Sequence, residues 1–311
     1  SPDEIMVGVG GKHIIYNAMM ATLNPNDEVI IPAPFWVSYP DIVMLAEGKP
    51  VIVKCDASQD FKITPEQLEK NISENTKWLM LNSPSNPTGA VYSFNELKAI
   101  SEVLLKHPEV LVMTDDIYEK IIYDDNKFFT IASVEPKIKN RTLTLNGVSK
   151  AYCMTGWRLG YCGGPKDIIA GMNKIQSQST TSTSSISMAA SVEALNGNQD
   201  FIEKHNIQFK KRRDMVVEKL NKIQGLSCAV PSGAFYIYPS CVGVIGKQTP
   251  KGNTINTDED FMNYLLDSEG VAGVHGEAFG LSPYFRISYA TDNKTLIDAC
   301  ERIERACSNL K

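Results

Sequence analysis

The sequence predicts an α/β fold in which a mostly parallel, mixed sheet lies between layers of helices and is followed by a smaller α+β unit. The 311 residues are enough for one large domain or two of ordinary size. Short apolar runs alternate with helix-like segments through the first two thirds, which is typical of βαβ units. Beyond residue 197 a long charged helix follows, and after it short predicted strands and helices no longer alternate in the βαβ pattern. We therefore expect a large domain over residues 1–197, and a bridging helix with a small domain over residues 198–311.

The first two thirds contain short apolar runs that end in polar or small residues and that we predict as strands. These strands are residues 28–31, 50–54, 77–82, 110–114, 142–146 and 159–162. The predicted helices between them are residues 12–23, 37–46, 65–71, 93–106 and 165–174. Ser93 with Glu96 fits a capping box, in which each side chain satisfies a backbone N–H of the other residue.

The last third begins with a helix over residues 186–195 and a long charged helix over residues 199–223, which Gly225 is expected to end. The expected strands that follow are residues 234–238, 271–274 and 285–288. The expected helices are residues 258–268 and 293–308. Together they predict a compact α+β layer.

Composition excludes several classes of protein. Apolar residues make up 43% and charged residues 22% of the chain, which indicates a globular protein. The net charge of −5 provides no excess of cations for a nucleic-acid backbone. The longest stretch without charged residues, 223–246, contains two prolines and several glycines, so we expect no membrane span. The opening Ser-Pro-Asp-Glu has no signal-peptide pattern.

Cysteine and histidine usage points to a reducing compartment and to no metal site. Seven cysteines, an odd number without a CxxC pair, argue against a disulfide framework, and we expect a cytoplasmic protein. The four histidines lie far apart and lack a ligand spacing such as HExxH.

A glycine pair precedes the first predicted helix and could bind a phosphate. Gly10 and Gly11 open this helix, where free N–H groups and the helix dipole favour an anion, and Lys12 adds a cation. A plain connection between a strand and a helix is the more common use of such a turn. The sequence alone leaves both alternatives open.

Two further motifs follow predicted strands. Asn86 lies in a stiff Pro-rich loop after residues 77–82, on the side of an α/β sheet where ligands bind. Asp115 follows residues 110–114 and precedes Tyr118 by three positions. An ordinary turn at Asn86 and a helix cap at Asp115 remain alternatives.

Lys150 is the most informative residue. It follows an apolar strand among small and apolar neighbours, whose burial of the amine would lower its pKa and make it a nucleophile toward a carbonyl. A surface lysine is the ordinary alternative. The residues that fall at strand ends, where one ligand could contact them all, are Gly11, Asn86, Asp115, Lys150 and Arg158. Arg286, inside an apolar strand, requires an anion, and a carboxylate suits its planar guanidinium.

With these motifs the chain resembles the class I, fold-type I pyridoxal-phosphate aminotransferases, and within them the bacterial-type aspartate aminotransferases. The matching segments are residues 9–12, 34–39, 82–90, 115–119, 146–161, 231–236 and 285–291. The resemblance implies the three-layer large domain and small C-terminal domain of that family. It also implies a homodimer, and that the N-terminal arm and first helices of the family are not among these residues.

The resemblance implies pyridoxal 5′-phosphate as the cofactor and a role for each motif. Lys150 would bind it covalently and transfer the substrate proton, and Asp115 would keep its pyridine nitrogen protonated. Tyr118 and Asn86 would hydrogen-bond the ring oxygen, and Trp36 would stack on the ring. The residues implied to hold the phosphate are Gly11, Lys12 and Arg158. The residues implied to contact substrate are Lys12, Trp36, Asn86 and Arg286.

The implied activity is transfer of an amino group between aspartate or glutamate and 2-oxoglutarate or oxaloacetate, in two half-reactions. Alternatives of the same fold are a prephenate or aromatic aminotransferase and a carbon–sulfur β-lyase. A third alternative is an inactive fragment that binds the cofactor or only dimerises.

Overall fold

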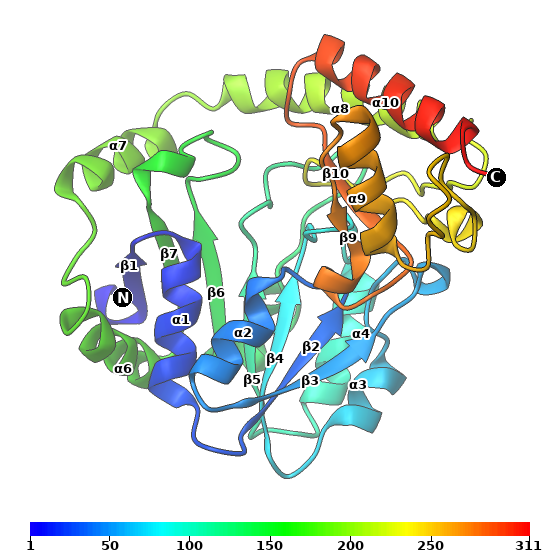
Figure 1. Cartoon of the computed structure of the whole chain (residues 1–311). Helices are drawn as coiled ribbons and strands as arrows, with labels where there is room; N and C mark the ends of the chain where they lie inside the picture. The colour runs from blue at the N-terminus through cyan, green and yellow to red at the C-terminus, as the bar shows by residue number, and fades with distance from the viewer.

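The computed structural model describes all 311 residues and contains two β-sheets of unequal size (Figure 1). The larger sheet has the strand order β1-β7-β6-β5-β4-β2-β3. Its strands are β1 (Ile5–Gly8), β2 (Glu28–Ala33), β3 (Lys49–Lys54), β4 (Thr76–Asn82), β5 (Leu111–Asp115), β6 (Thr142–Gly147) and β7 (Gly160–Gly163). The helices of this part are α1 (Gly11–Thr22), α2 (Ser38–Leu45), α3 (Pro65–Asn71), α4 (Phe94–Leu104), α5 (Ile131–Val134), α6 (Lys166–Ser177) and α7 (Ser185–Asn196).

Five neighbouring strands of the larger sheet, β3, β2, β4, β5 and β6, are parallel. Strand β7 runs antiparallel to both β6 and β1. Val29, Ile30 and Ile31 of β2 are all fully buried, as expected for a strand that is covered on both faces. The predicted mixed, mostly parallel sheet is therefore confirmed.

Helices cover both faces of the larger sheet. Helices α1, α2 and α6 pack on one face, in a core that includes Ile14, Val43 and Met172. Helices α3, α4 and α5 pack on the other face, where Leu68 and Ile100 are fully buried. The result is the three-layer arrangement expected from the alternation of apolar strands and helices.

The remaining chain forms the smaller unit. Helix α8 (Asp200–Leu220) runs from α7 to α10 (Figure 1). The smaller sheet has the order β8-β10-β9, and α9 and α10 pack beside it around a core with Val217, Phe261 and Ile303. Its elements are β8 (Tyr236–Ile237), α9 (Asp258–Glu269), β9 (Val274–His275), β10 (Phe285–Ser288) and α10 (Asn293–Ser308). None of the helices in the chain is both long and apolar enough to cross a bilayer.

Backbone hydrogen bonds join the start of the smaller sheet to loops of the larger one. Gly233 N donates to Gly89 O at 2.9 Å, and Ala234 N donates to Ile121 O at 2.9 Å. These bonds place β8, and β10 beside it, next to the loops that follow β4 and β5.

Each strand and helix predicted from sequence has a counterpart, and the Ser93–Glu96 capping box forms as expected. Some boundaries differ. Strand β8 starts after Ala234, because Ala234 has a φ of 56° and bonds outside the small sheet. Strand β9 is shifted from 271–274 to Val274–His275, since only these residues pair with β10. Helix α8 ends at Leu220, before the expected stop. No range is predicted for strand β1, which precedes the glycine turn, or for helix α5, whose four residues are too few to show helical periodicity.

Gly160 offers a test of how tightly β7 packs against the start of α1. A Cβ on Gly160 would lie 2.5 Å from Gly11 N, and backbone cannot move aside as a flexible side chain can. We expect Gly160→Ala to lower the free energy of unfolding in urea by about 1–3 kcal/mol, a typical cost of overpacking. The control is Gly156→Ala, since a Cβ at Gly156 meets nothing within 4 Å. Equal stability of the two variants would contradict this packing.

Candidate active site

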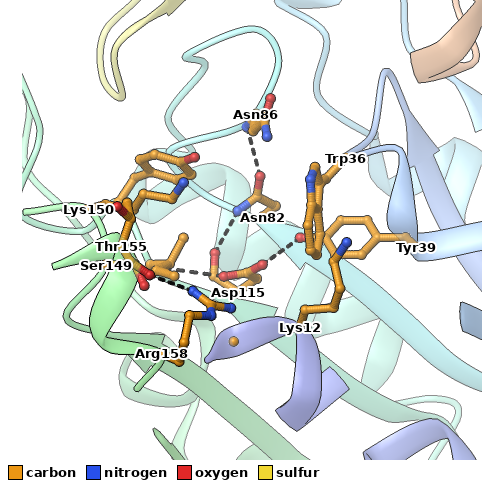
Figure 2. A pocket seen from close by; sticks show the side chains of 13 residues that line it. Lys12, Trp36, Tyr39, Asn82, Asn86, Asp115, Ser149, Lys150, Thr155 and Arg158 are labelled. Carbon is orange, nitrogen blue, oxygen red and sulfur yellow. Dashed lines mark hydrogen bonds between the residues drawn. The ribbon is translucent and has the colours of Figure 1, made fainter. Parts of the chain in front are cut away.

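A cavity of about 210 Å³ opens at the edge of the larger sheet where β4, β5 and β6 end and α1 begins (Figure 2). Ligands of open α/β sheets bind at this edge. The residues that line the cavity are Gly11, Lys12, Trp36, Tyr39, Asn82, Asn86, Asp115, Ile117, Tyr118, Ser149, Lys150, Thr155 and Arg158. Every residue predicted to bind the cofactor is among them.

Arg286, the remaining predicted residue, is not among the lining residues but reaches the site through one of them. Its Nη1 donates to Asn86 Oδ1 at 2.8 Å. The guanidinium carbon lies 4.7 Å from the ring centre of Tyr236 and 5.0 Å from that of Phe279. Its Nε is buried without an acceptor. Arg286 therefore retains a donor without a partner on a guanidinium that packs beside two aromatic rings.

The start of α1 and Arg158 form an anion-binding end of the site. Gly10 caps the helix with a φ of 86°, and the N–H groups of Gly11 and Lys12 have no acceptor within the chain. A Cβ at Gly10 would lie 2.5 Å from Arg158 Nη2, so glycine allows the guanidinium to approach the turn. Arg158 Nη1 donates to Thr155 O at 2.7 Å. Free N–H groups beside a cation suit a phosphate.

Asp115 ends β5 and is 5% exposed. Its Oδ2 accepts a hydrogen bond from the Tyr39 hydroxyl at 2.7 Å, and its Oδ1 accepts from Ile117 N at 3.3 Å. Burial raises the pKa of Asp115 to about 6, although these two donors and the charge of Lys150 favour the ionised form. Asp115 is therefore a carboxylate at neutral pH, held inside the protein.

Asn82 connects three parts of the site that come from different loops. Its Nδ2 donates to the backbone oxygen of Asp115 at 2.8 Å, and its Oδ1 accepts from Asn86 N at 2.8 Å (Figure 2). Asn82 thus fixes the loop that carries Asn86 against the end of β5. Asn86 in turn accepts the hydrogen bond from Arg286.

Lys150 follows β6 and directs its amine over aromatic rings. Its Nζ lies 5.5 Å from the ring centre of Tyr118 and 5.8 Å from that of Phe235. Burial lowers the pKa of the amine, and the charges of Arg286 and Arg158 lower it further, while Asp115 opposes the shift. The pKa direction predicted from the neighbours of Lys150 is the one found. An amine with a lowered pKa is a nucleophile for a carbonyl carbon.

Aromatic side chains form the walls of the cavity. Tyr118 is 2% exposed, and its hydroxyl lies 2.9 Å from that of Tyr236. Trp36 is half-buried, and Lys12 Nζ lies 4.9 Å from its ring centre. An indole face on one side and a phenol on another suit a flat aromatic ligand.

Five lining residues were not predicted: Tyr39, Asn82, Ile117, Ser149 and Thr155. Asn82 ends a predicted strand and Ser149 precedes Lys150, so their positions in the sequence could have indicated them. Tyr39 lies in a segment used for the resemblance, but nothing local indicates that its hydroxyl reaches Asp115.

The site fits the cofactor that the resemblance implies. The free N–H groups beside Arg158 could hold its phosphate, the amine of Lys150 could react with its aldehyde, and the Asp115 carboxylate could pair with its pyridine nitrogen. A Cβ at Gly10 would fill part of the phosphate end. No group of three or more His, Cys, Asp or Glu side chains is arranged to hold a metal ion.

Comparison with known proteins agrees with this geometry. A family model described as "Aminotransferase class I and II" matches residues 1–303. The aspartate aminotransferase of Rhizobium meliloti (strain 1021) is 58% identical over 308 residues, which cover 99% of this chain and 75% of the relative. The aspartate/prephenate aminotransferase of Cereibacter sphaeroides is 55% identical over 310 residues, covering 100% of this chain and 78% of the relative.

The fold is also that of a solved structure. The crystal structure of the aspartate aminotransferase from Rhizobium meliloti superposes with a TM-score of 0.98 at 57% sequence identity. The match covers 100% of this chain and 78% of that one.

The lowered pKa of Lys150 can be tested by trace acylation. At a pH below the ordinary lysine range, Lys150 has a larger neutral fraction than a normal amine, so its reaction with acetic anhydride is expected to reach half its maximal rate at a lower pH. The comparison residue is Lys98, whose pKa is raised by its hydrogen bond to Glu135. Mass spectrometry of the digested protein measures both rates. A midpoint pH for Lys150 at or above that of Lys98 would contradict the lowered pKa.

Proposed function

The chain belongs to the class I and II aminotransferase family and is a pyridoxal-phosphate-dependent aminotransferase, and on this premise we propose that its preferred substrates are L-aspartate and L-glutamate with their 2-oxo acids. The observation that carries the proposal is the set of cations that line one cavity or reach it through a lining residue. If Arg158 and the start of α1 hold the phosphate, Lys12 and Arg286 remain for the two carboxylates of a dicarboxylic substrate. The 58% identical relative is named aspartate aminotransferase.

The cofactor, when bound, supplies an aldehyde that condenses with amines and an electron-withdrawing ring that weakens the bonds at the substrate Cα. Lys150 would bind this aldehyde and, once displaced by substrate, would accept the Cα proton on its neutral Nζ. The lowered pKa of the amine supports both tasks. Asp115, ionised above about pH 6, would hold the proton on the pyridine nitrogen.

Other residues would bind and orient the cofactor. Tyr118 and Asn86 would hydrogen-bond the ring oxygen, and Trp36 would stack on one face of the ring. Arg158, with the N–H groups of Gly11 and Lys12, would hold the phosphate. Support comes from the placement of all these residues on one cavity.

Arg286 would bind the α-carboxylate that all amino-acid substrates share. Its planar guanidinium can make two parallel hydrogen bonds to a carboxylate. The bond from Arg286 to Asn86 and the ring of Tyr236 orient the guanidinium beside the cavity. Its buried, unpartnered Nε supports the presence of a further acceptor when substrate is bound.

We also propose that two copies of the chain form a homodimer. Several large apolar side chains are exposed, including Val37 (36%) and Leu45 (67%) on the segment that follows Trp36. On α7, Ile186 and Val192 are 72% and 60% exposed. Single exposed apolar residues are ordinary, but several of them on the same helices support a surface that is covered by a second copy.

The division into residues 1–197 and 198–311 is proposed as the boundary between a large and a small domain, in line with the two sheets. A cytoplasmic location is proposed because all seven cysteines are free thiols, which fits a reducing compartment.

The function is tested by adding pyridoxal phosphate, L-aspartate and 2-oxoglutarate to the purified protein. We expect equal amounts of oxaloacetate and glutamate. With L-cysteine in place of aspartate and no 2-oxo acid, release of pyruvate, ammonia and sulfide would instead indicate β-elimination. Protein that stays colourless after incubation with the cofactor and removal of the excess would indicate an inactive fragment. Prephenate is included as a second amino acceptor, because one relative is named aspartate/prephenate aminotransferase.

Lys12 is expected to determine the preference for a second carboxylate. Lys12→Ala should lower kcat/KM for aspartate by about 10-fold or more relative to its effect on alanine or phenylalanine, since a hydrogen bond to a charged group is lost. Steady-state kinetics with the three donors and one common acceptor measure this ratio. Equal losses for all three donors would contradict the role of Lys12.

Arg286 is expected to act on every substrate. Arg286→Lys retains the charge but loses the planar pair of donors, so kcat/KM should fall by about 10-fold or more for aspartate, alanine and phenylalanine alike. Cofactor binding, measured by absorbance, should change little. A loss confined to aspartate would place the second carboxylate, and not the α-carboxylate, at Arg286.

A further inference from the structure

Tyr39 makes a buried contact with Asp115 that the roles proposed above do not use. Tyr39 is 3% exposed, and its hydroxyl donates to Asp115 Oδ2 at 2.7 Å. The two residues lie on α2 and at the end of β5, 76 positions apart in the sequence. Figure 2 shows the phenol directed at the carboxylate within the cavity.

Tyr39 makes the shorter of the two hydrogen bonds that the Asp115 carboxylate accepts within the chain. Ile117 N is more distant, at 3.3 Å from Oδ1, and Asn82 donates to the backbone oxygen of Asp115 rather than to its carboxylate. Lys150 acts on Asp115 through its charge. Loss of the Tyr39 hydroxyl would therefore leave Oδ2 buried without its donor.

The segment that holds Tyr39 also carries the aromatic wall. Tyr39 N donates to Trp36 O at 2.9 Å, and the two rings pack edge to face with their centres 5.5 Å apart. The proposed stacking residue and the donor to the carboxylate therefore belong to one turn. Tyr39 therefore links the segment of Trp36 to the carboxylate of Asp115.

The charge state of the pair follows from its surroundings. The titratable groups that influence Asp115 or are influenced by it are Tyr39 on α2, Asp116 and Tyr118 after β5, and Lys150 after β6. Burial and the charge of Asp115 raise the pKa of Tyr39 well above its ordinary value, so its hydroxyl remains a donor. Burial raises the pKa of Asp115 to about 6. The hydrogen bond from Tyr39 is the largest of the influences that lower this pKa.

We propose that Tyr39 is a positioning residue that keeps the carboxylate of Asp115 ionised and in one orientation for the pyridine nitrogen of the cofactor. The inference rests on the role of Asp115 proposed above. Tyr39 need not contact the cofactor or the substrate for this role, since it acts through Asp115.

The test is the dissociation constant of pyridoxal phosphate, measured by ultrafiltration and absorbance as a function of pH for the wild-type protein and Tyr39→Phe. A protonated Asp115 cannot hold the pyridinium, so affinity falls as the pH drops through the pKa of the free carboxyl. Without the hydroxyl this pKa rises, and the fall should begin about one pH unit higher. Affinity should then differ by up to about tenfold near pH 6 and much less at alkaline pH.

The matched control is Tyr92→Phe. Tyr92 is also buried, but its hydroxyl accepts a hydrogen bond from Ile63 N, away from Asp115. Its acid midpoint should equal that of the wild-type protein. Thermal unfolding of both variants confirms that they fold. A Tyr39→Phe profile that is parallel to the wild-type profile, with or without a uniform loss of affinity, would overturn the inference.

Asp115→Asn, alone and combined with Tyr39→Phe, separates this inference from the role of Asp115. If Tyr39 acts through Asp115, removing its hydroxyl should cost little further affinity in the Asp115→Asn background. An equal loss in both backgrounds would overturn the inference. If Asp115→Asn alone leaves the affinity unchanged, the proposed role of Asp115 itself fails. If Asp115→Asn weakens binding while the Tyr39→Phe midpoint does not move, only the inference about Tyr39 fails.

Discussion

The alignment of the carboxyl ends of β4, β5 and β6 is the constraint on which the candidate active site depends. In the parallel ladder Asn82 lies opposite Asp115, and Asp115 lies opposite Leu145, so the loops after the three strands leave the sheet at one edge. A shift of one residue in either pairing would turn Asp115 to the other face of the sheet. The antiparallel pairs of β7 bring Gly160 against Gly11, which places the start of α1 at the same edge.

Burial at this edge of the sheet shifts the pKa values of Asp115 and Lys150, and these shifts suit both groups to catalysis. Removal from water raises the pKa of Asp115 and lowers that of Lys150, which moves both groups toward neutrality. Asp115 nevertheless stays ionised at neutral pH, because its pKa rises only to about 6. Perturbed pairs of this kind in a cavity are typical of catalytic sites. Tyr39 and Lys150 offset the cost of a buried carboxylate that would otherwise take up a proton.

The smaller unit contributes residues to the site that lie far from the others in the sequence but close to them in space. Arg286 on β10 bonds to Asn86 after β4, and Tyr236 on β8 lies beside Tyr118 after β5. The bond of Gly233 to Gly89 and that of Ala234 to Ile121 join the two units. The proposed carboxylate site therefore exists only where the two sheets meet, so substrate binding depends on how the smaller unit is placed.

The sequence by itself determined the order and type of nearly all strands and helices, because apolar periodicity and capping are local properties. It also identified residues at strand ends that line the cavity, among them Gly11, Asp115 and Lys150. The family resemblance seen in the sequence is confirmed by the comparisons. Only the tertiary structure decided the pairing of β1, the shortened β8 and β9, and the contacts of Tyr39 and Asn82 with Asp115. These features join segments far apart in the chain, and a long-range hydrogen bond leaves no periodic signal in the sequence around either partner.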